Sequence, residues 1–321
     1  MKVLVLGAGA TGGYFGGRLL EAGRDVSFLV RKKRASQLRT HGLALRSPQG
    51  TARLTPHVLT ENSLQETFDL IVLSCKAYDL ESAMTAIAPA IGPYTAILPL
   101  LNGLRHYEAL DARFGARRVL GGLCSIAVTM AEDGAIEHLS PMHVLRFGER
   151  DGSDSARIAA LTTLFTEINA DAKPSPDILQ ALWEKWVMLA SLAGMTCLMR
   201  ASVGDIVAAP EGKALMLQFL HECSEVAKAY GHPPRPAVLE GTQNMLTEAG
   251  SRFTASMLRD LESGGRVEAD HVLGDMITRG AAQNISTPLL RIAYTHLKAY
   301  EARQARTNSA RSEAQRAAAA A

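Results

Sequence analysis

The chain has 321 residues, 47% of them hydrophobic, and a formal net charge of +2. A single hydrophobic core usually stops growing at about 250–300 residues, so this length predicts two domains. The nearly balanced charge argues against a general nucleic-acid-binding or membrane-binding surface.

The N-terminal segment fits a secretory signal peptide poorly. Its apolar run breaks at Gly7, and the segment continues through Arg18 and Arg24, whereas a signal peptide carries about 7–15 consecutive apolar residues. No later stretch approaches the roughly 18 uninterrupted apolar residues of a membrane span. The four cysteines are scattered without a C-x-x-C pair, which is typical of reduced thiols. We therefore expect a cytoplasmic protein with no membrane or nucleic-acid partner.

In the first half of the chain, short apolar or β-branched runs alternate with helical stretches. The runs predict strands at residues 2–6, 26–30, 70–74, 96–101, 119–129 and 144–147, which is the pattern of one open, mostly parallel α/β sheet. Residues 43–54 alternate around a turn at 47–50 and favour a hairpin that decorates this sheet without extending its core. The sequence therefore predicts an α/β domain over residues 1–172.

The second half carries apolar residues at helical spacing. Helices are expected at residues 177–199, 212–229, 236–248 and 267–279, and a last helix should open at Pro288 and end near Arg303. These helices predict an all-α domain over residues 173–303, whose apolar faces allow a homodimer. Residues 304–321 lack large apolar side chains and predict a flexible tail, either a frayed helix or disordered.

A glycine-rich turn joins the first expected strand to the first helix. The sequence Gly7-Ala8-Gly9-Ala10-Thr11-Gly12 opens a βαβ unit of the length expected for a dinucleotide-binding motif. Gly7 permits the tight turn, Gly9 lets backbone N–H groups approach a pyrophosphate, and Gly12 lets the helix pack closely on the strand. We therefore expect a Rossmann-type doubly wound sheet that binds a dinucleotide, with Ala10 and Thr11 also beside the phosphates.

The residue after the second strand indicates which dinucleotide. An acidic side chain there would accept the ribose 2′-hydroxyl of NAD, whereas an arginine accommodates the 2′-phosphate of NADP. The strand ends at Val30-Arg31, so Arg31, helped by Lys32 or Arg34, predicts NADP. An ordinary solvated basic turn is the alternative interpretation.

Three further residues lie at positions where a ligand could bind or a reaction could occur. Lys76 and Asn102 each follow an apolar strand, where open α/β sheets bind ligands, and Lys185 lies in the tryptophan-containing helix segment 182–186. Taken singly, Lys76 and Asn102 could be ordinary helix-start residues, and Lys185 could extend from a tryptophan-rich face to solvent.

Together, these features resemble the ketopantoate reductase (2-dehydropantoate 2-reductase) family over the chain up to about Arg303. The likeness rests on the glycine motif, Arg31, Lys76, Asn102-Gly103, Lys185, the segment 256–260, Glu268 and Asp270. It implies a Rossmann domain, a helical domain, and NADPH-dependent reduction of a 2-oxo acid in pantothenate biosynthesis. It further implies Lys185 as general acid, Glu268 as its partner, Asn102 as a positioning residue and Ser256 as the substrate-carboxylate site.

The same likeness has three departures at expected substrate positions. Family members that reduce ketopantoate carry asparagines where this chain has Leu189, Ala193 and Phe253. A site that loses hydrogen-bonding amides holds a polar substrate less well. The sequence therefore leaves three functions open: a ketopantoate reductase, a reductase of a less polar 2-oxo acid or ketone, and a non-catalytic NADP-sensing protein.

A metal site is a competing interpretation of one helix face. Glu268, His271 and Asp275 have the spacing i, i+3, i+7 and include the Glu-x-x-His element of di-metal helical bundles. Such sites need a second copy of this element and further carboxylates, which the sequence does not supply. We therefore expect no bound metal.

Overall fold

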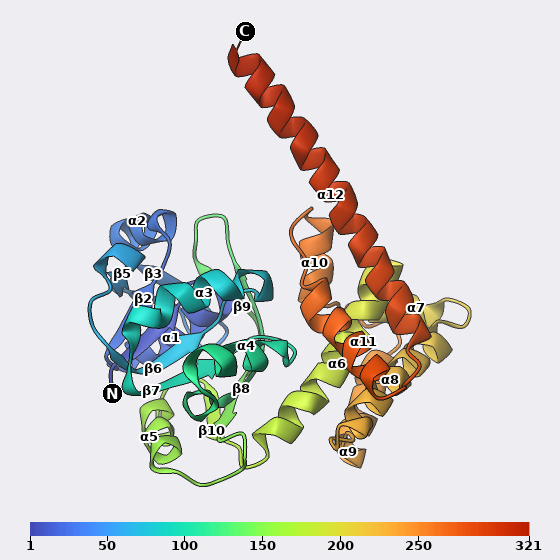
Figure 1. The fold of residues 1–321 in the computed structure, drawn as a ribbon, viewed down its shortest axis with the longest axis horizontal. Helices are drawn as coiled ribbons and strands as arrows, with labels where there is room; N and C mark the ends of the chain where they lie inside the picture. Colours follow the sequence, from blue (N-terminus) through green and yellow to red (C-terminus); the bar gives the residue numbers. More distant parts are fainter. Residues whose placement is uncertain (321) are drawn as a thin grey trace. The chain divides into compact units, whose positions relative to one another are not determined.

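The computed structural model describes residues 1–320 and divides into two compact units. The N-terminal unit comprises Met1–Leu182, and the C-terminal unit begins at Trp183. Figure 1 colours the first blue through yellow-green and the second yellow through red. The predicted boundary at residue 172 falls inside strand β10, Asp171–Pro174, which belongs to the N-terminal unit.

A five-stranded parallel sheet forms the centre of the N-terminal unit. Its strand order is β5-β2-β1-β6-β7, and all four pairings are parallel. Strands β1 and β2 are buried along their whole length, which explains why both read as unbroken apolar runs. The strands are β1 Val3–Leu6, β2 Val26–Leu29, β5 His57–Leu59, β6 Phe68–Leu73 and β7 Ile91–Pro99.

The expectation of one sheet was wrong, because a second, mixed sheet forms beside the first. Its order is β10-β9-β3-β4, with β8 paired to β9. Strands β8 and β9 form a long antiparallel hairpin, because the chain turns back at Ala131–Gly134, where Gly134 has a positive φ of 82°. The strands are β3 Leu43–Arg46, β4 Ala52–Leu54, β8 Gly121–Met130, β9 Ile136–Gly148 and β10 Asp171–Pro174.

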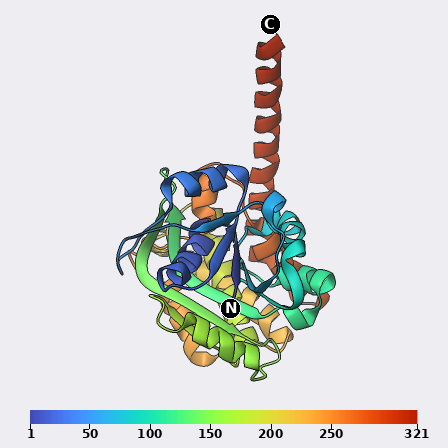
Figure 2. The ribbon, with the colours of Figure 1, turned by 90° about the vertical axis from the view of Figure 1, so that its left-hand side faces the viewer.

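Helix α1, Ala10–Glu21, packs against both sheets. A Cβ on Gly16 would lie 2.8 Å from the Phe28 ring of the first sheet, and one on Gly17 would lie 2.9 Å from Leu45 of the second. Figure 2 shows α1 in dark blue between the blue strands and the green β9. The hairpin β3–β4 is therefore not decoration, because Leu43 and Leu45 are fully buried.

Four further α-helices complete the N-terminal unit. Serine 155 caps the last of them by accepting a hydrogen bond from the backbone of Ile158, as expected for a helix N-terminus. These helices are α2 Lys32–His41, α3 Leu80–Ile87, α4 Arg105–Phe114 and α5 Ala156–Phe165.

The part of the C-terminal unit that the structure describes is helical, which confirms the predicted α/β plus all-α fold class. The expected helix at 267–279 is interrupted, because a π-helical turn at Asp270–Gly274 precedes α11. The last helix continues past Arg303, since its alanines, arginines and glutamines are strong helix formers. The helices are α6 Ile178–Met199, which starts in the N-terminal unit, α7 Val203–Ala208, α8 Gly212–Ala229, α9 Pro236–Leu246, α10 Ser256–Glu262, α11 Asp275–Ala282 and α12 Pro288–Ala320.

Two findings bear on the expected surroundings of the protein. Within residues 1–320, no helix is long and apolar enough to cross a membrane. The four cysteines form no disulfide with one another, and Cys124, Cys197 and Cys223 are buried. Burial raises the pKa of the Cys223 thiol to about 12, so this cysteine behaves as a small core residue.

Candidate functional site

The candidate cofactor residues lie along one edge of the first sheet. The glycine turn follows β1, Arg31 follows β2, Lys76 follows β6, and Asn102 follows β7. The sheet order places these strands as the consecutive neighbours β2-β1-β6-β7, all parallel. Their carboxyl ends therefore meet at one edge, which is where open α/β sheets bind ligands.

Backbone hydrogen bonds give the glycine turn a defined shape. Gly7 has a φ of +89°, a conformation that favours glycine, and its N–H donates to Leu29 O at 3.0 Å. The Gly13 N–H donates to Gly9 O at 2.8 Å and starts the hydrogen bonding of α1. The turn thus links the ends of β1 and β2 to the helix.

The start of α1 has the features of an anion site. Gly9 is the N-cap residue, it supplies no side-chain cap, and the first helical turn holds no acidic residue. A Cβ built on Gly9 would meet no atom within 4 Å, so the space above this backbone is open. Exposed N–H groups at a helix N-terminus attract phosphate, and these residues fit a dinucleotide pyrophosphate.

Gly12 serves a different purpose, namely close packing. A Cβ there would lie 2.1 Å from Ser74 Oγ and 2.5 Å from Gly7 O. Ser74 Oγ itself donates to Leu6 O at 3.1 Å and joins the ends of β1 and β6. Our sequence analysis missed Ser74, although a small polar residue directly after an apolar strand was the available signal.

Arg31 lies at the protein surface, where a ligand phosphate could reach it. Its side chain is 77% exposed, and its Nη2 atom lies 3.1 Å from Asp79 Oδ2. Asp79 lies in the turn after β6, so this ion pair joins segments that follow the two neighbours of β1. Exposed ion pairs contribute little stability, and an incoming phosphate can compete for the guanidinium. Lys32 is also exposed.

Lys76 and Asn102 are both partly buried. Lys76 is the N-cap residue of a 3-10 turn at Ala77–Asp79. Asn102 precedes Gly103, whose φ of +73° turns the chain into α4. Both residues therefore lie in local turns at the sheet edge, after the strands where the sequence placed them.

In the C-terminal unit, Lys185 lies between two anchored neighbours on α6. Glu184 accepts hydrogen bonds from the Arg235 backbone N–H at 2.9 Å and from Arg235 Nε at 2.7 Å. On the other side, Trp186 donates from Nε1 to Val272 O at 2.9 Å. Glu184 and Trp186 are buried, whereas Lys185 is partly exposed. The helix is thus fixed on both sides of the candidate general acid.

Glu268 is connected to the hydrogen bond between Trp186 and Val272. It is 9% exposed, and its backbone carbonyl accepts from the Val272 N–H at 2.9 Å. Val272 lies in the π-helical turn at Asp270–Gly274. Its backbone carbonyl accepts the hydrogen bond from Trp186 Nε1. One short path of hydrogen bonds therefore joins the Lys185 helix to the Glu268 segment, and sequence analysis missed the Trp186 link in this path.

The remaining predicted substrate residues differ in exposure. Ser256 is exposed and is the first residue of α10. Phe253 is 41% exposed, Leu189 is partly exposed, and Ala193 is only 1% exposed. The backbone of Phe253 is held by α7, because the Val203 N–H donates to Phe253 O at 3.0 Å. Apolar surface therefore occupies two of the three positions at which family asparagines were expected.

The competing metal interpretation has no support from geometry. Across residues 1–320, no group of three or more histidine, cysteine, aspartate or glutamate side chains could hold a metal ion. Asp275 instead pairs with Arg279, whose Nε lies 3.1 Å from Asp275 Oδ2. The Arg279 guanidinium also lies 5.8 Å from the centre of the Trp186 ring, which places this carboxylate in an aromatic and cationic environment.

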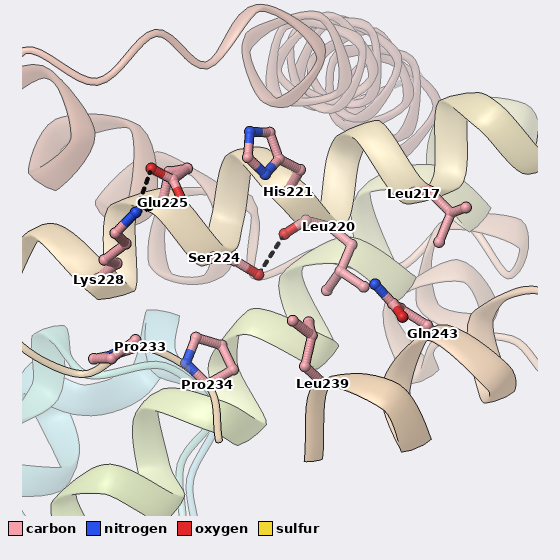
Figure 3. A pocket seen from close by; sticks show the side chains of 10 residues that line it. All are labelled: Leu217, Leu220, His221, Ser224, Glu225, Lys228, Pro233, Pro234, Leu239 and Gln243. Atoms are coloured by element: carbon pink, nitrogen blue, oxygen red, sulfur yellow. Dashed lines mark hydrogen bonds and ion pairs between the residues drawn. The ribbon is translucent and has the colours of Figure 1, made fainter. Parts of the chain in front are cut away.

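One pocket of the C-terminal unit contains none of the predicted site residues. It has a volume of about 210 Å³ and is lined from α8, α9 and the segment between them. Figure 3 shows apolar side chains such as Leu220 and Leu239 facing it, with Ser224 bonded to Leu220 O at 2.8 Å and Lys228 paired with Glu225. Ser224, Glu225 and Lys228 thus have internal partners, and we assign this pocket no function.

Two family models match the chain. Residues 3–152 match the model described as ketopantoate reductase PanE/ApbA, and residues 177–301 match the C-terminal model of the same family. The two matches cover the residues along the sheet edge and the candidate residues of the C-terminal unit.

Known proteins resemble the chain over nearly its whole length. The uncharacterized oxidoreductase YkpB of Bacillus subtilis is 38% identical over 94% of this chain and 99% of its own length. A 2-dehydropantoate 2-reductase of Halobacterium salinarum is 28% identical over 91% and 96%. The crystal structure of a PanE/ApbA family ketopantoate reductase from Ralstonia eutropha is 26% identical, with a TM-score of 0.86 over 95% of this chain and 99% of that one.

Proposed function

Because this chain belongs to the ketopantoate reductase family and is an oxidoreductase, we propose that it uses NADPH to reduce a 2-oxo acid to a 2-hydroxy acid. The leading substrate is 2-dehydropantoate, which would assign the enzyme to pantothenate biosynthesis. The observation that carries the proposal is the row of the glycine turn, Arg31, Lys76 and Asn102 along one edge of a parallel sheet. This edge has both an open helix N-terminus and an exposed arginine.

The residues of the chain then have distinct roles. Bound nicotinamide supplies the hydride, and negative charge develops on the ketone oxygen as hydride arrives at carbon. In this proposal, Lys185 Nζ donates a hydrogen bond to that oxygen and delivers the proton that completes the alcohol. Glu268 is the carboxylate partner of Lys185. Ser256 binds the substrate carboxylate, and Asn102 orients nicotinamide and substrate.

Turnover of a panel of 2-oxo acids, followed by loss of NADPH absorbance, tests this function. Replacing Lys185 by alanine should lower kcat by about 10²- to 10⁴-fold, since general acids contribute this much, and should leave the Kd for NADPH within about twofold. The matched control is Lys213→Ala, which removes an exposed lysine of α8. Unchanged turnover in Lys185→Ala would exclude the assigned role.

The alternative substrate class is a 2-oxo acid or ketone with a less polar side chain. Leu189 and Phe253 favour it, because both present apolar surface. In that case Leu189→Asn combined with Phe253→Asn should raise kcat/KM for 2-dehydropantoate and lower it for an aromatic 2-oxo acid. Ala193 is left unchanged, since an amide at a position only 1% exposed would need buried hydrogen-bond partners.

The same assay identifies the third alternative. NADPH binding without turnover of any 2-oxo acid would indicate an NADP-sensing protein. A homodimer in the cytoplasm is also part of the proposal, and light scattering of the purified chain measures the oligomeric state. A monomeric mass at assay concentration would exclude the homodimer without affecting the proposed reaction.

A further inference from the structure

Within the basic run 31–34, the Arg34 side chain is directed to the protein interior by hydrogen bonds to Ala8 O and Gly134 O. Its Nε donates to Ala8 O at 3.0 Å, inside the glycine turn. Its Nη1 donates to Gly134 O at 2.9 Å, in the turn between β8 and β9. We propose that Arg34 is a positioning residue that fixes the glycine turn for dinucleotide binding and does not itself bind the 2′-phosphate.

The hydrogen bond to Ala8 O controls the peptide that a pyrophosphate would approach. In a planar trans peptide, the carbonyl of one residue and the N–H of the next point in opposite directions. Because Arg34 holds the Ala8 carbonyl, the Gly9 N–H is directed away from Arg34. A Cβ built on Gly9 would meet no atom within 4 Å, so the space beside its α-carbon is open.

The rest of the guanidinium is held by the β8–β9 turn. Nη1 also donates to Gln37 Oε1 at 2.7 Å, and Gln37 Nε2 donates to Asp133 O at 3.0 Å. Gly134 has a positive φ of 82°, and a Cβ there would lie 1.9 Å from Gln37 Nε2 and 2.7 Å from Arg34 Nη1. The turn is therefore shaped around this pair of side chains.

The third nitrogen is not available to a ligand phosphate. Arg34 Nη2 is buried and has no hydrogen-bond partner. Burial lowers the pKa of the guanidinium, yet arginine keeps its charge in proteins, so a positive charge remains beside the turn. Arg31, at 77% exposure, is the contrasting residue. On this inference, Arg34 does not help Arg31 to select NADP, in contrast to our expectation from the sequence.

The inference rests on the proposed cofactor site, and Kd values for NADPH and NADH test it. For Arg34→Lys, whose single amine cannot span both carbonyls, we expect both Kd values to rise about tenfold, with their ratio unchanged within about twofold. For Arg31→Gln, only the Kd for NADPH should rise. The matched control is Arg39→Lys, because Arg39 also lies on α2 and donates to a backbone carbonyl, that of Val58.

Kinetics separate positioning from general loss of structure. A mispositioned turn raises KM for the nucleotide and leaves kcat at saturation unchanged, whereas partial unfolding lowers the amount of active enzyme and thus kcat. If Arg34→Lys does not fold, Gly134→Ala disturbs the same contacts from the β8–β9 turn and should also raise both Kd values. An increase confined to NADPH, or no change in either Kd, would overturn the inference. Absence of nucleotide binding in the unmodified chain would instead refute the proposed function.

Discussion

The candidate cofactor site of the N-terminal unit consists mainly of backbone, whereas the candidate catalytic residues of the C-terminal unit are side chains on separate helices. Gly7, Gly9 and Gly12 act through conformation, open space and close packing. The roles proposed for Lys185 and Glu268 depend on their functional groups, and a hydrogen bond from Trp186 joins α6 to the π-turn. A site built from backbone groups depends on a short stretch of chain. A site built from side chains depends on the fold to hold together segments that are far apart in the sequence.

The largest expected effect distinguishes two glycines of the same turn. Gly12→Ala places a methyl group 2.1 Å from Ser74 Oγ and 2.5 Å from Gly7 O, so we expect a loss of about 3 kcal/mol or more in unfolding free energy. Gly9→Ala meets no atom within 4 Å, so its stability should stay within about 1 kcal/mol. Its Kd for NADPH should nevertheless rise at least about tenfold, because the methyl group occupies the space for the pyrophosphate.

Thermal unfolding and fluorescence titration of the two variants measure these quantities. Equal stability losses in Gly9→Ala and Gly12→Ala would contradict the separate roles assigned to them. Unchanged NADPH binding in Gly9→Ala would show that the pyrophosphate lies elsewhere on the sheet edge.

The contrast between the two units also explains how far the sequence could be interpreted. The strand, glycine turn and following helix are local, so the sequence was enough to predict the tight turn at Gly7 and the close packing at Gly12. The second sheet was missed because β9 pairs with β3 and β10, which are far from it in sequence. Alternation shows that residues 43–54 form a hairpin but does not show which face becomes buried.

Side-chain partners were the least predictable feature. A run of basic residues gives no sign that Arg34 bonds to Ala8 O and Gly134 O while Arg31 stays exposed. The π-turn after Glu268 was likewise missed, since its apolar spacing fits an ordinary helix. Both depend on segments that meet only in the folded chain, about 86 positions apart for Trp186 and Val272.

A smaller effect is expected for the link between α6 and the π-turn. Trp186→Phe keeps an aromatic ring but removes the N–H that binds Val272 O at 2.9 Å. A buried hydrogen bond contributes about 0.5–1.5 kcal/mol, so misalignment of Lys185 and Glu268 should lower kcat up to about tenfold. The Kd for NADPH should not change, because the glycine turn lies in the other unit.

Trp183→Phe is the matched control for this prediction. The Trp183 ring stacks on Tyr230 and His232, with ring centres 5.4 and 5.6 Å away, so its replacement alters packing on α6 while the Trp186 hydrogen bond remains. We expect kcat close to that of the unmodified enzyme once the folded fraction is taken into account. Equal kcat losses in both variants would mean that packing of α6, and not the hydrogen bond, positions Lys185.

The smallest expected effect comes from a side-chain ion pair in the N-terminal unit that lies outside the glycine turn. Glu149 accepts from Arg157 Nε at 2.6 Å and from Ser155 Oγ at 2.6 Å, and the Arg157 guanidinium in particular lowers the pKa of this carboxyl. A lowered folded-state pKa adds stability that is complete above the unfolded-state pKa of about 4.3 and is lost as the pH falls through the folded-state value. Glu149→Gln should therefore cost about 1 kcal/mol at pH 7 and less in acid, as measured by urea unfolding across this pH range. NADPH binding should be unaffected at neutral pH, and a weakened Kd would show that the cofactor site depends on side chains well beyond its backbone turn.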